Sequence, residues 1–470
     1  MKVIIQNLGI IRYAEFEPAQ LTLICGNNNA GKTYVTYTLY GFFSLWKQLV
    51  VYKVSDNIIE TLWNDSHVNL DMHDCTKTIQ NILDEGCQKY VMLLPRVFAT
   101  KADRFKDTKF SIQIDKKEID YNLPFHQETG SGTTNIISVD KKINSSIISI
   151  SLLIDHKKTK LTKDALKNYI NHILSEIIFG QFFTNTYIAS TERTGAAIFR
   201  KELDFARNRL IAEIGANAAS AVKADNTLEL VIKSYQDYAL PVNANVDFSR
   251  NLEATTKDKS YIATEYPEII EAFSDIIGGD YQVNKKEGLV YIPKKGRTRL
   301  SMQESSSSVR SLLDIGFYLK HVIQKGDILM IDEPELNLHP SNQRRMAHMF
   351  AQLINAGIRI FVTTHSDYLV RELNTLIMLN GNGHPLTSIM EESGYSEAEL
   401  LDASKIHIYI ADEGKVLIPE TNKNSKCHTL TLANIDPYYG IEVTTFDDTI
   451  REMNHIQDRI LEEIEGGDHD

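Results

Sequence analysis

Cysteine is scarce in this sequence, and long apolar runs are missing from it. The chain of 470 residues has only four cysteines, Cys25, Cys75, Cys87 and Cys427. They are too few and too scattered for a disulfide framework or a paired-cysteine metal site, so we expect reduced thiols. No apolar run approaches the ~20 residues that cross a bilayer, and residues 1–18 lack the pattern of a targeting signal. These absences predict a soluble, cytoplasmic protein with no membrane contact.

Positive charge is also in deficit, with 50 basic against 62 acidic residues and a formal net charge of −12. This balance argues against a surface that coats nucleic acid. Two short basic runs, residues 157–160 and 294–297, are either solvated loops or local contacts for DNA. The content of 43% apolar and 24% charged residues is that of a folded chain, long enough for two lobes that share a core.

One segment near the N-terminus carries a complete phosphate-binding pattern. Residues 21–25 favour a buried strand, and residues 34–46 favour a helix. The sequence between them matches the pattern GxxxxGK[ST] and consists of Gly26, Asn27, Asn28, Asn29, Ala30, Gly31, Lys32 and Thr33. Such a loop turns backbone N–H groups toward phosphate oxygens at the positive end of a helix.

Two side chains of this loop suit the phosphates of ATP and its magnesium ion. Lys32 brings a positive charge to the β- and γ-phosphates, and the hydroxyl of Thr33 is available to Mg²⁺. Gly26 and Gly31 permit the turn of the backbone. We therefore predict that residues 26–33 bind ATP together with Mg²⁺.

An apolar strand is expected far downstream, within residues 326–334, and it ends in two adjacent carboxylates. Neighbouring side chains on a strand point to opposite faces, so Asp332 and Glu333 should have different roles. We assign Asp332 to the magnesium ion, through water, and Glu333 to the polarisation of the attacking water. Glu333 and Lys32 are thus candidate catalytic residues.

A histidine follows the acidic strand after one more helix and one more strand. We expect the helix to begin near Pro340 or Ser341, and residues 358–364 to form an apolar strand that ends at His365. Ligands of open α/β sheets bind at the carboxyl ends of the strands. His365 is either a structural histidine or a catalytic sensor of the γ-phosphate, and its position favours the sensor.

Four consecutive serines, residues 305–308, precede the acidic strand. The apolar positions from Val309 to Phe317 follow helical spacing, which places the serines at the N-terminus of a helix. The serines either cap this helix or grip a γ-phosphate with their hydroxyls and the free N–H groups. Four in a row exceed the need of a cap, and we favour Ser306 and Ser307 as nucleotide ligands.

The stretch from Asp332 to Pro340 resembles the DEPExxLHP pattern of prokaryotic ATPases related to SMC, DNA-repair and OLD-family heads. The resemblance implies an α/β fold, an ABC-type P-loop head with a mixed central sheet flanked by helices. In such heads a Ser-Gly-Gly signature binds the nucleotide of the other protomer, and residues 335–339 would cross to that protomer. Serines replace the glycines in this chain, as in the signatures of OLD-like defence ATPases.

A signature of this class cannot fold back onto its own phosphate loop, so the resemblance implies a homodimer around ATP. Two-fold symmetry then builds two equal sites, in a dimer or in a higher-order assembly of dimers. The alternative is a monomer in which the serines only cap their helix.

The region between the phosphate loop and the serines is where such heads differ. This region has no sustained heptads, so we expect no long coiled coil in it. We expect strands at 110–114 and 146–151 in a small sheet, helices over 161–183 and 197–239, and a hairpin over 278–299. Residues 190–195 resemble a strand-to-loop element of the same ATPases. Its Arg193 is either a surface ion-pairing residue, which we favour, or lies near nucleotide or the dimer seam.

The C-terminal part is expected to hold strands at 375–379 and 406–410 and an acidic helix at 447–465. From these patterns we expect the chain to divide into four segments. They are an N-terminal ATPase lobe with the phosphate loop and a β-rich part (1–158), an inserted, mostly helical lobe (159–280), a C-terminal ATPase lobe (281–405) and a strand with the acidic helix (406–470).

No nuclease pattern is recognisable, and the C-terminal part is too short for the Toprim module of OLD-family enzymes. Any cutting therefore belongs to a separate effector protein, a nuclease or a toxin. Resemblance to ATPase subunits of anti-phage systems such as Septu and PARIS implies a sensor whose ATP cycle controls that effector. The alternative is a DNA-repair or chromosome-handling ATPase that clamps DNA. Transport is disfavoured because it needs a membrane partner.

Overall fold

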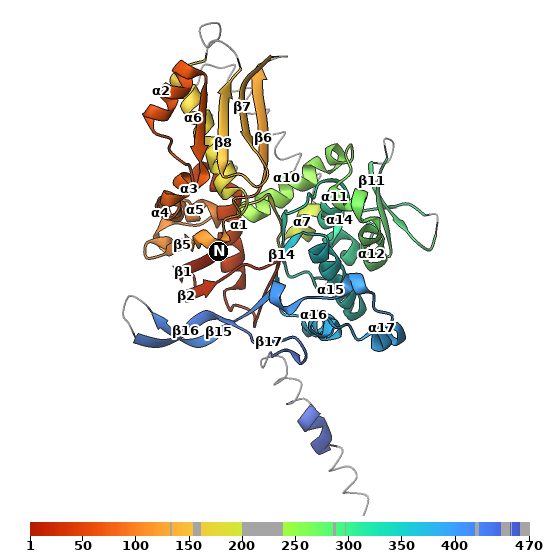
Figure 1. The fold of residues 1–470 in the computed structure, drawn as a ribbon. Coiled ribbons are helices and arrows are strands. Elements are labelled where there is room, and N and C mark those ends of the chain that lie inside the picture. The colour runs from red at the N-terminus through yellow and green to blue at the C-terminus, as the bar shows by residue number, and fades with distance from the viewer. Residues whose placement is uncertain are drawn as a thin grey trace, which may run out of the picture. The chain divides into compact units, whose positions relative to one another are not determined.

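The computed structural model describes residues 1–131, 134–153, 161–199, 238–284, 288–296, 298–418, 423–442, 452 and 454–460. Its chain divides into two units (Figure 1). The first unit comprises residues 1–8, 14–17 and 38–186, and the second comprises 9–13, 18–37 and 187–470. The four segments expected from the sequence stay a prediction.

The second unit is built on a six-stranded mixed sheet in the order β16-β15-β3-β14-β13-β9. These strands are β3 (Leu21–Cys25), β9 (Thr186–Ala189), β13 (Ile328–Asp332), β14 (Arg359–Thr364), β15 (Ile406–Ile418) and β16 (Lys423–Leu432). Every residue of β3 and β13 is buried, as expected of parallel strands covered on both faces. The strands expected at 358–364 and 406–410 are confirmed.

The register of this sheet brings three strand ends level. β13 and β15 run parallel to their neighbours β14 and β3, and β14 runs parallel to β3. Asp332 pairs with Thr363, and Thr364 pairs with Cys25. The residues that follow β3, β13 and β14 therefore emerge at the same edge of the sheet, where ligands of such sheets bind.

Helices of the second unit pack against the sheet and against each other. They are α7 (Arg193–Ile198), α10 (Leu240–Thr255), α11 (Tyr261–Glu265), α12 (Pro267–Ile277), α13 (Ser307–Ser311), α14 (Leu313–His321), α15 (Pro340–Asn355), α16 (Asp367–Asn380) and α17 (Thr387–Ser393). α15 begins at Pro340 as expected, with His339 as its N-cap. A hairpin of β10 (Gly279–Asn284) and β11 (Gly288–Pro293) confirms the turn expected over 278–299. Short strands complete the unit at Leu300–Ser301, Ile435–Asp436 and Gly440–Ile441.

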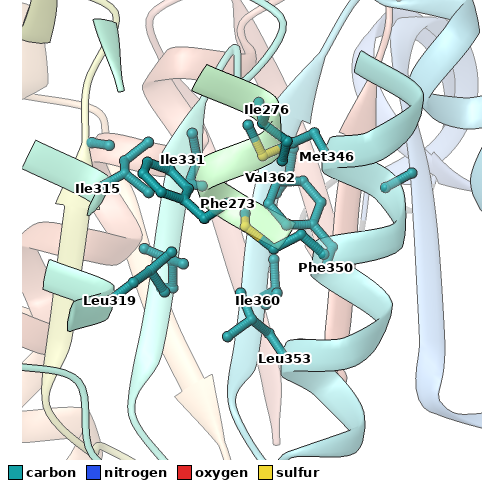
Figure 2. Close-up of a cluster of buried hydrophobic side chains, with 14 of the residues drawn as sticks. Phe273, Ile276, Ile315, Leu319, Ile331, Met346, Phe350, Leu353, Ile360 and Val362 are labelled. Carbon is teal, nitrogen blue, oxygen red and sulfur yellow. The ribbon is translucent and has the colours of Figure 1, made fainter. Parts of the chain in front are cut away.

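One apolar cluster joins the helices α12, α14 and α15 to the strands β13 and β14, as Figure 2 shows. Its labelled members are Phe273, Ile276, Ile315, Leu319, Ile331, Met346, Phe350, Leu353, Ile360 and Val362, each at most 4% exposed. Ile360 and Val362 alternate along β14 and so share one face of the sheet. Burial of each such side chain contributes about 1.5–3 kcal/mol, which holds the sheet and its helices in one arrangement.

The first unit holds two small sheets. β1 (Lys2–Leu8) lies between β5 (Lys109–Gln113) and β2 (Ile11–Phe16, of which the residues from Ala14 on belong here), and the other sheet has the order β4-β8-β7-β6. The four strands of this second sheet are β4 (His67–Asp71), β6 (Phe125–Ser131), β7 (Thr134–Lys141) and β8 (Ile147–Leu152). The strands expected at 110–114 and 146–151 exist, but they belong to different sheets.

Helices of the first unit include a long helix with a glycine in its middle. They are α1 (Lys32–Leu49, of which the residues from Thr38 on belong here), α2 (Asp56–Asp65), α3 (Met72–Cys75), α4 (Ile79–Val91), α5 (Leu94–Val97) and α6 (Lys163–Phe179). A Cβ at Gly41 would lie 2.3 Å from the hydroxyl of Tyr90, which donates a hydrogen bond to the carbonyl oxygen of Thr38. Only glycine leaves room for Tyr90 at this point of α1.

One expectation about local structure was wrong. Residues 375–379 lie in α16 and form no strand, because Ser366 caps a helix whose buried residues, among them Leu369, Leu373 and Leu376, follow helical spacing. The helix start expected at the serines is confirmed, because Ser306 is the N-cap of α13, and the helical region continues after Leu312 as α14.

Several expected features lie outside the described residues. They are the basic run 157–160, Arg297 of the run 294–297, nearly all of the helix expected over 197–239 and much of the one expected over 447–465. In that last range residues 452 and 454–460 are described, and they are helical.

The expected fold class is confirmed as an α/β head with a mixed central sheet and packed helices. The longest helix among the described residues is α1 with 18 residues, so these ranges contain no long coiled-coil arm. None of the helices in the same ranges has the length and apolar character that a membrane crossing needs.

A polar network ties α15 and α16 to the chain after α17. His348 on α15 lies 2.8 Å from Glu372 and 3.1 Å from Glu399. Glu372 also accepts hydrogen bonds from Arg344 and from the hydroxyl of Tyr395. Burial lowers the pKa of His348, but its hydrogen bonds to the two carboxylates outweigh burial and raise this pKa to about 9.

We expect His348 to make the stability of the protein decrease with pH. A pKa that folding raises contributes stability fully below its ordinary value of 6.5, and the contribution is lost as pH rises through about 9. In His348→Gln the decrease in unfolding free energy across this window should be smaller by on the order of 2 kcal/mol. Chemical denaturation at about pH 6 and about pH 9 measures it, with His67→Gln at an exposed histidine as the control. An unchanged slope in His348→Gln would contradict the assignment.

Candidate active site

The phosphate-binding loop lies between β3 and α1, and its backbone needs two glycines. Gly26 has a φ of 146°, and a Cβ there would lie 2.4 Å from the carbonyl oxygen of Ala411 on β15. Gly31 has a φ of 93°, and a Cβ there would lie 2.6 Å from the side chain of Ile11. Both positions are therefore closed to other residues by backbone strain and by space.

Lys32 reaches back over the loop that precedes it. Its ammonium group donates hydrogen bonds of 2.9 Å to the carbonyl oxygens of Gly26 and Asn27, and the residue is 5% exposed. The three asparagines, residues 27–29, are exposed at the tip of the loop. The charge of Lys32 is thus held against the loop whose N–H groups suit phosphate.

Thr33 and Asp332 meet although 299 positions separate them. The hydroxyl of Thr33 donates a hydrogen bond of 3.3 Å to Oδ2 of Asp332, and the hydroxyl of Thr363 donates one to Oδ1. Burial raises the pKa of Asp332 to about 6, against the opposing hydrogen bonds from Thr363 and Thr33. A hydroxyl beside a buried carboxylate offers the hard oxygen ligands that Mg²⁺ prefers, so Thr33 and Asp332 fit this ion.

Glu333 has a left-handed backbone, with a φ of 53°. Its N–H donates a hydrogen bond of 3.0 Å to the carbonyl oxygen of Thr363, which continues the pairing of β13 with β14 by one residue. Its side chain is 24% exposed, and Oε1 lies 3.5 Å from Nδ1 of His365. The turned backbone separates the side chain of Glu333 from that of Asp332, in agreement with two different roles.

His365 follows β14 directly and lies between two carboxylates. Its Nδ1 is 3.3 Å from Oε1 of Glu335 and 3.5 Å from Oε1 of Glu333. Glu335 was expected to cross to a partner protomer, which is wrong for this side chain, because it is buried within its own chain. Residues 336–339 remain candidates for that contact, and Asn337 and His339 are exposed.

Arg193 is buried beneath the acidic strand end, with only 1% of its surface exposed. It donates hydrogen bonds of 2.7 Å to the carbonyl oxygens of Asp332 and Glu333. Two more, of 2.8 and 2.9 Å, go to the carbonyl oxygens of Ser190 and Ser311. One guanidinium therefore links the acidic strand end, the turn after β9 and the C-terminal end of α13.

The favoured expectation of a surface ion pair for Arg193 was therefore wrong. Its partners are backbone carbonyl groups, which no sequence pattern names. The adjacent Glu192 also has a partner that the sequence did not indicate. Its carboxylate accepts a hydrogen bond of 2.9 Å from the hydroxyl of Tyr37 on α1. The element 190–195 thus contacts α1 as well as the acidic strand end.

The serine cluster forms the start of α13. Ser306 is the N-cap, and its side chain accepts a hydrogen bond from the N–H of Val309. Ser306 and Ser307 are exposed, whereas Ser305 is buried and donates its hydroxyl to the carbonyl oxygen of Ser301. The capping role is thus real for Ser306, and the hydroxyl of Ser307 remains at the surface.

A family model described as "AAA ATPase domain" matches residues 1–370. The chain belongs to this family. The match includes the loop 26–33, the acidic strand end and His365, which the structure brings to one edge of the sheet within the second unit. The catalytic role of each of these residues stays a prediction. No match is found among curated proteins.

Solved structures of SMC heads show a weak likeness to this ATPase-family chain. The SMC head domain from Thermotoga maritima is 8% identical, with 93% of this chain and 98% of that chain covered and a TM-score of 0.30. An Smc head from Pyrococcus furiosus bound to the C-terminal domain of ScpA is 12% identical, with 97% and 98% covered and a TM-score of 0.28. An SmcHead bound to the C-winged helix domain of ScpA is 12% identical, with 79% and 91% covered and a TM-score of 0.30.

We expect Arg193→Met to lower the free energy of unfolding by about 3 kcal/mol, because four carbonyl oxygens lose their charged donor. Arg371→Met is the matched control, since Arg371 is 53% exposed and pairs with Asp367 one helical turn away. Its loss should cost about 0.5 kcal/mol or less. Chemical denaturation of both variants measures the difference, and equal costs would contradict the buried role of Arg193.

Proposed function

We propose that this chain binds ATP with Mg²⁺ and hydrolyses it to ADP and phosphate. The observation that carries the proposal is the hydrogen bond between Thr33 and Asp332, which joins the phosphate-binding loop to the acidic strand end. Two motifs that lie 299 positions apart meet at the atoms that suit a magnesium ion. The family match supports the same chemistry.

Each residue of the site then has one task. Lys32 and the N–H groups of the loop hold the phosphates, while Thr33 and Asp332 hold Mg²⁺, which neutralises charge on the phosphate oxygens. Glu333 accepts a hydrogen bond from the attacking water and polarises it. His365, at the end of β14, contacts the γ-phosphate and reports its presence.

We propose further that two copies of the chain share each nucleotide. Ser306 and Ser307 are exposed at the start of α13, where their hydroxyls would exchange local contacts with Ser308, Val309 and Arg310 for the ATP of a second copy. An isologous pair would contain two equal sites, each with the loop of one copy and the serines of the other. ATP would close the pair, and hydrolysis would reopen it.

The cycle of closing and reopening suits a sensor. We propose that the pair controls a separate effector, a nuclease or a toxin, as the ATPase component of a bacterial anti-phage defence system. The resemblance of residues 332–340 and of the serines to OLD-like defence ATPases supports this role. Isolation of the tagged protein from its own cells tests it, because such an effector should co-purify. Turnover that DNA stimulates, without a protein partner, would instead favour a DNA clamp.

We expect Glu333→Gln to retain ATP binding and to reduce turnover by at least ~10²-fold. The amide keeps the shape of the side chain but is a far weaker acceptor for the proton of water. ATP should also trap the variant as a dimer, which size-exclusion chromatography with light scattering detects. Glu391→Gln, at an exposed residue of α17 away from the phosphate-binding loop, the acidic strand end and the serines, is the control. Undiminished hydrolysis by Glu333→Gln would reject its role.

A mixture of two inactive variants tests whether the site is shared. Lys32→Ala removes the loop charge, and the double change Ser306→Ala with Ser307→Ala removes the hydroxyls. We expect both to be inactive alone, because each damages both sites of its homodimer. A mixed dimer regains one intact site, so combined variants should recover about a quarter of the wild-type activity after random pairing. A mixture as inactive as its components would contradict the shared site.

A further inference from the structure

The backbone of Glu333 has an unusual conformation at the point where β13 ends. Its φ is 53°, a left-handed value that a residue with a side chain seldom adopts, and Pro334 follows it. A residue before proline is pushed toward extended backbone, so the conformation of Glu333 is disfavoured on two counts. Such a conformation persists only where its surroundings fix it. The bonds on either side of its Cα are therefore the ones that must hold it.

One guanidinium holds both peptide groups that flank the Cα of Glu333. Nη1 of Arg193 donates a hydrogen bond to the carbonyl oxygen of Asp332, and Nη2 donates one to that of Glu333, each of 2.7 Å. The N–H of Glu333 also donates a hydrogen bond of 3.0 Å to the carbonyl oxygen of Thr363. The dihedral angles φ and ψ of Glu333 set the angle between these two planar peptide groups. A rigid, planar fork that holds both of them therefore fixes the direction of the side chain.

The guanidinium of Arg193 is itself anchored by two other backbone groups. Nε donates a hydrogen bond of 2.9 Å to the carbonyl oxygen of Ser311, and Nη1 donates a second one, of 2.8 Å, to that of Ser190. Four of its five N–H groups are thus engaged, and the residue is 1% exposed. All four bonds go to carbonyl oxygens, so Arg193 acts on the backbone and leaves the carboxylate of Glu333 to other partners.

We propose that Arg193 is a positioning residue for hydrolysis, which sets the direction of the Glu333 side chain through the two peptide groups that flank its Cα. The proposal rests on the proposed function in one respect, namely that Glu333 polarises the attacking water. Arg193 touches no nucleotide in this role. Its loss displaces the carboxylate from the water and leaves the phosphate-binding loop unchanged, and a displacement of about 1 Å can cost about 10²-fold in rate.

Arg193→Lys tests the proposal, because lysine keeps the positive charge but has a single ammonium group, which cannot hold both peptide groups as a planar fork does. With rates taken per folded molecule, we expect kcat to fall by about 10- to 100-fold and KM for ATP to stay within about 2-fold. Arg359→Lys is the matched control, at a half-buried arginine at the opposite end of β14, and its kcat should stay within about 2-fold of wild type. Equal kcat values for Arg193→Lys and its control would overturn the proposal.

A double-mutant cycle separates positioning from general damage to the fold. In the Glu333→Gln background, Arg193→Lys should lower the single-turnover rate by no more than about 2-fold further, because the residue that it positions is already disabled. Losses that multiply would overturn the proposal, since they would show that Arg193 acts independently of Glu333.

Crystal structures without nucleotide test the same idea without any hydrolysis. Glu333 should keep its left-handed φ in wild type and in Arg359→Lys, whereas in Arg193→Lys its carboxylate should move by more than about 1 Å or lose its defined position. If Arg193→Lys does not fold, Arg193→Gln replaces it, because a neutral amide is less costly to bury and has only two N–H groups to donate. An unmoved carboxylate overturns the inference even if ATP is hydrolysed. A displaced carboxylate, where the wild type hydrolyses no ATP, overturns the proposed function alone.

Discussion

The parallel pairing of β3, β14 and β13 is the constraint on which the site depends. It sets the ends of three strands level, so that the phosphate-binding loop, the two carboxylates and the histidine emerge at one edge. The apolar cluster over β13 and β14 keeps this register, because a slip by one residue would turn its buried side chains to the opposite face. The pairing of the strands therefore brings together, in one site, residues that lie hundreds of positions apart in the sequence.

Arg193 fixes the backbone next to the strand ends by hydrogen bonds. A guanidinium that is 1% exposed would be costly without partners, and four carbonyl dipoles satisfy it. Two of them belong to Asp332 and Glu333, where the backbone leaves the strand and turns left-handed. A displacement of α13, whose Ser311 shares the same guanidinium, therefore bears on the backbone of Glu333.

The sequence predicted the parts of the site that repeat a local pattern. The loop 26–33 and the strand before it, the carboxylates that end β13 and the start of α15 at Pro340 all follow from short-range signals. Arg193 and Glu335 were misplaced because only the fold brings their partners near, namely backbone carbonyl groups for Arg193 and the residues at the end of β14 for Glu335. Residues 375–379 were misread for a related reason, since five apolar residues suit a strand or a buried helix equally until the cap at Ser366 is considered.

The contact between Gly26 and Ala411 has a consequence for where the head ends. The family match stops at residue 370, yet β15 begins at Ile406 and pairs along the whole of β3. The carbonyl oxygen of Ala411 lies so close to Gly26, the first glycine of the phosphate-binding loop, that no side chain fits there. A fragment cut at the limit of family similarity would expose β3 as an edge and leave that loop without its support, so the head includes β15.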